Sequence, residues 1–305
     1  MAVYEDMQAL IGNTPIVQLK NINKELNNTI YAKLELYNPS GSVKDRTGKY
    51  MIEDAEKKGL LKEGSTIVEA TAGNTGLGIA FAALSKGYKV KFVVPTKFSI
   101  EKQQLMMALG AEIINTPREE GMLGAARKAE ELLKTIPDAI ALRQFENQSN
   151  PLAHYETTGP EIYADLNGKI DYIVMGAGSG GTFTGIVKYL KEKNPAIQAV
   201  LADPDGSTIG GGEHHDYNIE GIGNDFIAAT MDITLVDKVI KVNDEEAFAG
   251  ARELAAKEGI IAGSSSGAAY AAAKKLAKET EGKNIVIVLP DRGDRYFSTG
   301  LWERK

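Results

Sequence analysis

Residues 171–190 read DYIVMGAGSGGTFTGIVKYL, which is an apolar run, a glycine-rich turn and an amphipathic segment in direct succession. The apolar run at 171–176 predicts a buried strand, and the spacing of apolar residues from Phe183 onward predicts a helix. A strand, loop and helix in this order form half of a parallel crossover unit. The stretch therefore predicts an α/β fold with an anion-binding turn at the end of one strand.

The same alternation of apolar runs and amphipathic segments covers most of the 305 residues. We therefore expect two doubly wound, three-layer α/β domains with mostly parallel sheets. Residues 39–147 would form the smaller, mobile domain, and 1–38 with 148–305 the larger one. The polar run QFENQSNP (144–151) marks the crossing between them, and the active site would lie in between. Strands are predicted at 29–36, 66–70, 89–95, 112–116, 139–143, 171–176, 198–203, 238–242 and 284–290, with helices at 45–59, 75–87, 99–111, 123–135, 183–193, 244–259 and 266–280.

Composition restricts the class of protein. Hydrophobic residues make up 43% and charged residues 25% of the chain, as in an ordinary globular protein. The net charge of −6, without a basic block, argues against nucleic acid as a partner. The absence of cysteine excludes disulfides and thiolate nucleophiles, and the presence of only three histidines argues against a metal site. Without a long apolar run or a signal peptide, we expect no membrane contact and a cytoplasmic location.

The loop NPSGSVKDR (38–46) places Lys44 at the start of a predicted helix. The positive end of a helix dipole disfavours a cation, so a neutral amine or an imine would be better tolerated there. A solvated lysine is the alternative interpretation.

The loop EATAGNTGLGIA (69–80) joins a strand to a helix. Thr71, Asn74 and Thr75 offer polar side chains, and Gly73 and Gly76 let the backbone approach a ligand. Bare N–H groups at the start of this helix suit a carboxylate. The alternative is an ordinary helix start capped by Asn74.

The glycine turn of the opening stretch fits two kinds of phosphate ligand. Gly176, Gly178 and Gly181 satisfy the G-x-G-x-x-G pattern of dinucleotide sites, and Asp203 follows at about the distance of a ribose-binding acid. An NAD-dependent oxidoreductase therefore remains one interpretation. Ser179 and Thr182 add hydroxyl donors, which match the three acceptor oxygens of a phosphate monoester better than a pyrophosphate.

The segment GIIAGSSSGAAYAAA (259–273) has three serines between two glycines at the start of a predicted helix. One interpretation is a helix capped by Ser265 or Ser266 and packed closely on a sheet. The other places a serine hydroxyl against a heteroatom of a bound ring.

Together, NPSGSVKDR, TAGNTG, GAGSGGT and GSSSGAA resemble the fold-type II pyridoxal phosphate family, in the branch of cysteine synthase and cystathionine β-synthase. The likeness also includes IGNTPIVQL (11–19), 95–116, NPLAHYETTGPEI (150–162) and LPDRGDRYFST (289–299), and so covers nearly the whole chain. The resemblance implies a tryptophan synthase β-like fold, pyridoxal 5'-phosphate as cofactor and a homodimer.

The resemblance also implies roles for individual residues. Lys44 would hold the cofactor as an internal aldimine, Asn74 would contact its ring hydroxyl and Ser265 its pyridine nitrogen. The phosphate would lie on Gly176, Gly178, Ser179, Gly180, Gly181 and Thr182. The substrate would lie on residues of the 71–75 loop and on Gln144. Its carboxylate would be bound by Thr71, Asn74, Thr75 and Gln144, with Ala72 and Gly73 also in contact with the substrate.

The implied chemistry is β-replacement, in which the freed Lys44 amine removes the Cα proton. Loss of the β-substituent would leave an aminoacrylate, to which a thiol adds. Ala72 stands where the family usually has serine, and Asn224 where a tyrosine often appears.

The stretch EGIGNDFI (220–227) bears on the choice of thiol. It is similar to the EGIG-x-DFIP of cystathionine β-synthases, and Glu220, Gly221 and Asp225 would lie in a loop over the site. The acids would hold the amino group of homocysteine; a surface turn at 224–225 is the alternative. We expect cystathionine synthesis from O-acetylserine or serine and homocysteine. The alternatives are a cysteine synthase that uses sulfide, a serine or threonine deaminase, and a binding protein without activity. Docking of a serine acetyltransferase stays open.

Overall fold

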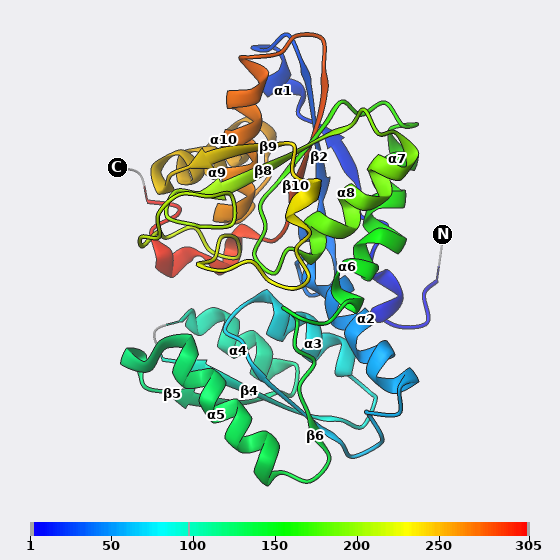
Figure 1. Ribbon diagram of the computed structural model, residues 1–305, viewed down its shortest axis with the longest axis vertical. Helices are drawn as coiled ribbons and strands as arrows, with labels where there is room; N and C mark the ends of the chain where they lie inside the picture. The colour runs from blue at the N-terminus through cyan, green and yellow to red at the C-terminus, as the bar shows by residue number, and fades with distance from the viewer. Residues whose placement is uncertain (1–2, 97, 304–305) are drawn as a thin grey trace.

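Two separate β-sheets organise the protein, as its computed structural model shows (Figure 1). The structure describes residues 3–96 and 98–303; positions 1–2, 97 and 304–305, which fall within the predicted domain ranges, lie outside the described residues. The larger sheet has six strands in the order β1-β2-β10-β7-β8-β9, and the smaller has four in the order β5-β4-β3-β6. β1 runs antiparallel to β2, and the other described pairs are parallel.

Strands and helices alternate along most of the chain, except that α7 follows α6, β9 follows β8 and α10 follows α9. The strands are β1 (Ile16–Gln18), β2 (Thr29–Leu34), β3 (Thr66–Ala70), β4 (Lys89–Pro95), β5 (Glu112–Thr116), β6 (Ala139–Ile140), β7 (Tyr172–Met175), β8 (Gln198–Pro204), β9 (Lys238–Val242) and β10 (Asn284–Leu289). The helices are α1 (Lys20–Asn23), α2 (Lys44–Lys57), α3 (Asn74–Ala83), α4 (Ile100–Ala108), α5 (Gly121–Thr135), α6 (Ser149–Ala153), α7 (Gly159–Asp165), α8 (Gly181–Lys193), α9 (Asp244–Glu258) and α10 (Ser264–Ala277), with a π-helical turn at His154–Thr158 between α6 and α7.

Helices cover both faces of each sheet. In the larger sheet, Ile287 of β10 packs with α9 and α10 on one face, and its neighbour Val286 packs with α7 and α8 on the other. In the smaller sheet, Phe92 of β4 packs with α2 and α3, whereas Val93 packs with α5. Successive strand residues point to opposite faces, so strands buried on both sides need continuous apolar runs. The prediction of two three-layer α/β units is confirmed.

The smaller sheet takes all its strands from residues 66–140, inside the predicted smaller domain. The predicted limits at 39 and 147 remain an expectation. Figure 1 shows the two units stacked along the long axis of the molecule, with α2 and α3 between them. The carboxyl ends of β3, β7 and β10 meet in this region, which positions the site described below.

The structure departs from the predicted secondary structure at several places. The strand expected at 139–143 ends at Ile140, because the backbone N–H groups of Leu142 and Arg143 donate to the Glu69 carboxylate instead of a strand neighbour. The short strand β1 was not predicted. The polar run at 144–151 leads into helices from Ser149 to Asp165, which were also not predicted.

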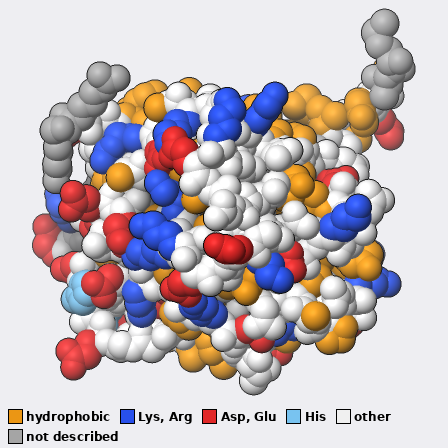
Figure 2. Space-filling view, turned by 90° about the horizontal axis from the view of Figure 1, so that it is seen from above, with side chains coloured by type: hydrophobic (Ala, Val, Ile, Leu, Met, Phe, Trp, Pro, Cys, Tyr) orange, Lys and Arg blue, Asp and Glu red, His pale blue; other side chains and the backbone are white. Residues whose placement is uncertain are grey.

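Charges are mixed on the end of the molecule seen in Figure 2, where cationic and anionic side chains are interspersed. Among residues 3–96 and 98–303, no helix has the length and apolar character needed to cross a bilayer.

Candidate active site

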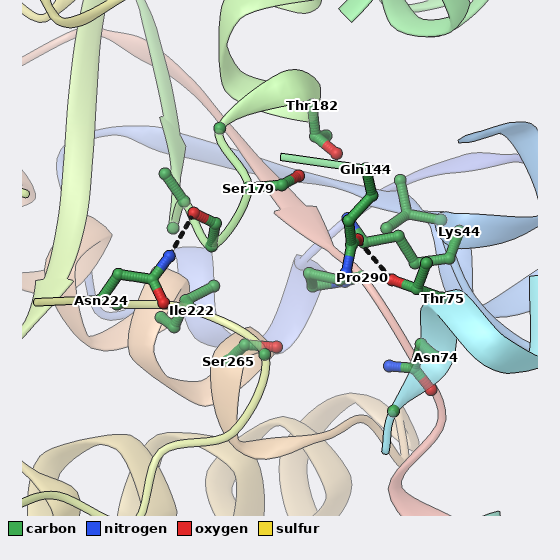
Figure 3. Close-up of a pocket in the computed structure, with 18 of the residues that line it drawn as sticks. Lys44, Asn74, Thr75, Gln144, Ser179, Thr182, Ile222, Asn224, Ser265 and Pro290 are labelled. Carbon is green, nitrogen blue, oxygen red and sulfur yellow. Dashed lines mark hydrogen bonds between the residues drawn. The ribbon is translucent and has the colours of Figure 1, made fainter. Parts of the chain in front are cut away.

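A cavity lies where the carboxyl ends of β3, β7 and β10 meet the N-termini of α2, α3, α8 and α10. Parallel strands deliver their following loops to the same edge of a sheet, so this is where α/β proteins bind ligands. Residues separated by more than 200 positions in the chain thereby share one site (Figure 3). The residues predicted for cofactor and substrate that line it are Lys44, Thr71, Ala72, Gly73, Asn74, Thr75, Gln144, Gly176, Gly178, Ser179, Gly180, Thr182, Gly221 and Ser265.

Lys44 is the first residue of α2 and lines the cavity. Burial lowers the pKa of its amine to about 8, and the Asp291 carboxylate opposes this shift. The fold therefore makes a neutral amine accessible near physiological pH. A lysine poised in this way is suited to covalent attachment of a carbonyl compound and to proton transfer.

The predicted carboxylate loop forms the start of α3. The Thr75 hydroxyl donates to Oε1 of Gln144 at 2.6 Å, which joins this loop to the segment after β6. Asn74 Nδ2 donates to Asp291 Oδ2 at 2.7 Å, and Arg295 Nη1 donates to Asn74 Oδ1 at 2.9 Å. Polar side chains and the free N–H groups of a helix start thus face the cavity, a suitable site for an anion.

The glycine turn ends β7 and leads into α8. Gly180 has φ +81°, and a Cβ there would collide with Met231. A Cβ on Gly178 would lie 2.6 Å from the Gly221 carbonyl oxygen. Asn224 Nδ2 donates to the Gly178 carbonyl at 2.8 Å and holds the 221–224 loop against the turn (Figure 3). The Ser179 and Thr182 hydroxyls face the same cavity, beside the N-terminus of α8.

Ser265 is the second residue of α10 and lines the cavity, whereas Gly263 occupies the N-cap position without a side-chain hydrogen bond. The interpretation of Ser265 or Ser266 as the helix cap is therefore wrong. Gly181 opens α8 and lies outside the cavity lining, directly against Asn150.

Three acidic residues singled out in the sequence do not line the cavity. Glu220 forms an ion pair with Lys102 of α4, at 2.5 Å. Asp225 is exposed. Asp203, the ribose-binding candidate, is buried beside Lys241 Nζ at 2.6 Å and accepts a hydrogen bond from Gly210 N. The roles predicted for Glu220 and Asp225 stay predictions.

Other residues around the site were not found from the sequence. Asn150, His154 and Thr230 contact the glycine turn from behind, and Arg295 contacts Asn74. Asn150, His154 and Arg295 fall inside stretches that carry the family resemblance. Their side chains reach the site only in the folded protein, so no spacing pattern in the sequence predicts their position there.

Comparison with known proteins identifies the group to which this chain belongs. Residues 7–291 match the model of a family described as pyridoxal-phosphate dependent enzyme. The chain belongs to this family. It is 50% identical over 304 residues, which are 99% of each chain, to an O-acetylserine dependent cystathionine beta-synthase of Bacillus subtilis. It is 47% identical to a cysteine synthase of Helicobacter pylori, over 99% of this chain and 100% of that one.

A solved structure of an O-acetylserine dependent cystathionine beta-synthase from Helicobacter pylori superposes with a TM-score of 0.94. It is 46% identical and covers 99% of this chain and 100% of its own. Both the fold and the resemblance inferred from the sequence are confirmed. The chain is a pyridoxal phosphate-dependent enzyme.

The cavity has the donors that pyridoxal phosphate requires. A phosphate monoester needs several hydrogen-bond donors, which the turn at 176–182 and the Ser179 and Thr182 hydroxyls can supply. The aldehyde needs an unprotonated amine, which Lys44 provides. Ser265 offers a neutral hydroxyl for the ring nitrogen. The residues present therefore fit the group.

Proposed function

We propose that this enzyme replaces the β-substituent of O-acetylserine or serine with homocysteine to form L-cystathionine. The observation that supports this is the convergence of Lys44, the phosphate turn and the carboxylate loop at 71–75 in one cavity. When bound, pyridoxal phosphate supplies the electron sink for loss of the Cα proton and the β-substituent. The similarity to the cystathionine beta-synthase of Bacillus subtilis favours homocysteine as the thiol.

In this proposal each loop has one task. The turn at 176–182 and the start of α8 hold the phosphate, Asn74 holds the ring hydroxyl and Ser265 accepts or donates at the ring nitrogen. Thr71, Thr75 and Gln144, with the N–H groups of α3, hold the substrate carboxylate. Lys44 takes the Cα proton as a neutral amine and returns it to Cα after the thiol has added. The leaving group departs as acetate. When serine is the donor, its hydroxyl would take the proton that Lys44 removed and leave as water, and the thiol proton would then pass to Lys44 for return to Cα.

A neutral hydroxyl at position 265 does not force a proton onto the ring nitrogen as a carboxylate would. The cofactor ring would then withdraw electrons from Cα less strongly, which favours rapid elimination of the β-substituent over transamination. Closure of the smaller domain on the substrate carboxylate would exclude water from the reacting centre.

Cysteine synthesis from sulfide is the second candidate, because the cysteine synthases of Helicobacter pylori and Escherichia coli are 47% and 45% identical to this chain. The two activities separate in a steady-state comparison of O-acetylserine and serine, each with homocysteine and with sulfide. We expect the higher kcat/KM with O-acetylserine and homocysteine. A kcat/KM for sulfide far above that for homocysteine would overturn the choice of thiol. Release of pyruvate without any thiol would indicate a deaminase instead.

The homodimer, the cytoplasmic location and docking of a serine acetyltransferase also remain proposals, each suggested by the family resemblance. Sedimentation of the purified protein tests the first of them: a mass near twice 32.8 kDa is expected, and a monomer would contradict it.

A further inference from the structure

A buried polar cluster lies directly behind the phosphate turn. Asn150 of α6 and His154 of the following π-helical turn are completely buried, and both contact hydroxyls that face the cavity. Asn150 Nδ2 lies 2.9 Å from Ser179 Oγ, and His154 Nε2 lies 3.2 Å from Thr182 Oγ1. Whether these hydroxyls can serve an anion depends on where their protons point.

The orientation of the Asn150 amide is fixed by a backbone carbonyl. Asn150 Nδ2 lies 2.9 Å from the carbonyl oxygen of Gln144, which can only accept a hydrogen bond. The nitrogen of the amide must therefore point this way, and its second proton is donated to Ser179 Oγ. Because Ser179 accepts from Asn150, its own proton is left to donate elsewhere.

The same amide also sets the direction of the next bonds. Its oxygen, Oδ1, accepts from the Thr47 hydroxyl at 3.3 Å, so the Thr47 proton is used there. Thr47 Oγ1 can then only accept a hydrogen bond from His154 Nε2, which lies 3.2 Å away. Nε2 must carry the imidazole proton, and the unprotonated Nδ1 accepts from the Thr158 hydroxyl at 2.9 Å.

Thr182 lies at the end of this chain of donors. His154 Nε2–H is shared between Thr47 Oγ1 and Thr182 Oγ1, each 3.2 Å away. Thr182 thus accepts from the imidazole and, like Ser179, keeps its proton for another partner. Figure 3 shows the Ser179 and Thr182 hydroxyls beside the same open space, at the N-terminus of α8.

We propose that Asn150 and His154 are positioning residues, which turn the hydroxyl protons of Ser179 and Thr182 into the cavity and so prepare two directed donors for the cofactor phosphate. The proposal rests on the phosphate site described above. Two further features support it. Burial, with the nearby Lys44 and Arg46 charges, lowers the pKa of His154 to about 3, so the ring stays neutral with a single proton. A Cβ at position 181 would overlap the Asn150 amide, so glycine at this position leaves room for that amide.

The first test measures the tautomer in the unmodified, full-length holoenzyme. The chain has three histidines, so [15N]histidine labelling and a long-range 1H–15N spectrum resolve the ring nitrogens, with the His154→Gln spectrum for assignment. We expect His154 to be protonated at Nε2 only, with no titration between pH 5 and 9. A proton on Nδ1, or a ring that titrates in this range, would overturn the proposal.

The second test compares two amide variants that differ in the place of their N–H. Glutamine at 154 puts its N–H where Nε2 lies, whereas asparagine is too short to reach that place. We expect His154→Asn to weaken pyridoxal phosphate binding about tenfold and to shift the 31P resonance of the bound phosphate. His154→Gln should stay within about threefold of wild type, because a donor to Thr182 remains. Equal effects of the two variants, or none from either, would contradict the proposal.

These results are independent of the reaction proposed above. The tautomer and the 31P resonance report on the cofactor phosphate alone, so they can fail while cystathionine synthesis is confirmed. Conversely, a preference for sulfide would leave both expectations intact.

Discussion

The ion pair between Lys102 and Glu220 joins the two α/β units beside the active site. Lys102 belongs to α4 of the smaller unit and is only 3% exposed, whereas Glu220 is 37% exposed and precedes the 221–224 loop of the larger unit. The Lys102 ammonium also lies 4.5 Å from the centre of the Tyr296 ring. We expect this pair to hold the smaller unit against the larger one.

Glu220→Gln would remove the charge but keep the shape, and would leave the buried Lys102 ammonium with a neutral acceptor in place of its counter-charge. Removal of one member of a fully buried pair costs about 3–5 kcal/mol. Because Glu220 retains partial contact with water, we expect a smaller cost of about 1–2 kcal/mol for the contact between the units. This corresponds to an equilibrium between closed and open forms shifted by roughly 5- to 30-fold.

Amide hydrogen exchange under native conditions measures this opening. The α4 amides of Glu220→Gln should exchange about 5- to 30-fold faster than those of wild type. Lys102→Met should give a smaller change, since it leaves only a carboxylate that is partly exposed to water. Asp225→Asn is the matched control, because Asp225 is an exposed acid of the same loop and should have no effect on α4.

Kinetics distinguish this role from the one expected from the sequence, where Glu220 binds the amino group of homocysteine. If Glu220 acts through Lys102, the KM values for homocysteine and sulfide should rise by the same factor. The reasoning is refuted by unchanged exchange in α4 together with a higher KM for homocysteine alone.

Three further perturbations follow from the site. Gln144→Leu removes the partner of the carboxylate loop and should raise the KM for O-acetylserine about tenfold with a smaller change in kcat; an unchanged KM would contradict it. The rate of cofactor attachment to apoprotein should rise tenfold per pH unit up to about pH 8 and then level off, because only the neutral Lys44 amine reacts. A midpoint near 10.5, the ordinary pKa of a lysine, would show that burial does not lower the pKa of Lys44. Gly180→Ala should release the cofactor on dialysis, because the new Cβ would collide with Met231 and the positive φ would add backbone strain of about 1–2 kcal/mol. Gly64→Ala is the control: this position has φ +85° and no neighbour within 4 Å, so the variant should show the backbone strain alone.

Much of the fold could be predicted because apolar-rich runs alternate with amphipathic segments along the chain. The predicted limits of the largely buried strands β3 and β4, and of the partly buried edge strands β5 and β9, are those of the structure. The segment after Ile140 could not be predicted, since Glu69, about 70 residues earlier in the chain, takes the N–H groups that a strand would use. The helices at 149–165 were missed because the polar run at 144–151 was interpreted as a crossing between domains, whereas Asn150 within it is buried and donates to Ser179 of the phosphate turn.

The site shows the same division. Lys44, Asn74, Ser179, Thr182 and Ser265 belong to short motifs that can be found in a sequence, and the structure brings them to one cavity. Asp203 illustrates the opposite case: its spacing suggested a ribose, yet its partner is Lys241, a contact across two neighbouring strands. Asn150 and His154 act through other residues, and only their hydrogen bonds show it.

Borohydride reduction followed by peptide mapping tests the assignment of Lys44 as the attachment site. The reduced holoenzyme should carry one pyridoxal phosphate group, on the peptide that contains Lys44, and Lys44→Ala should carry none. Attachment at another lysine, or a wild-type protein that binds a nicotinamide nucleotide and takes up no pyridoxal phosphate, would contradict it.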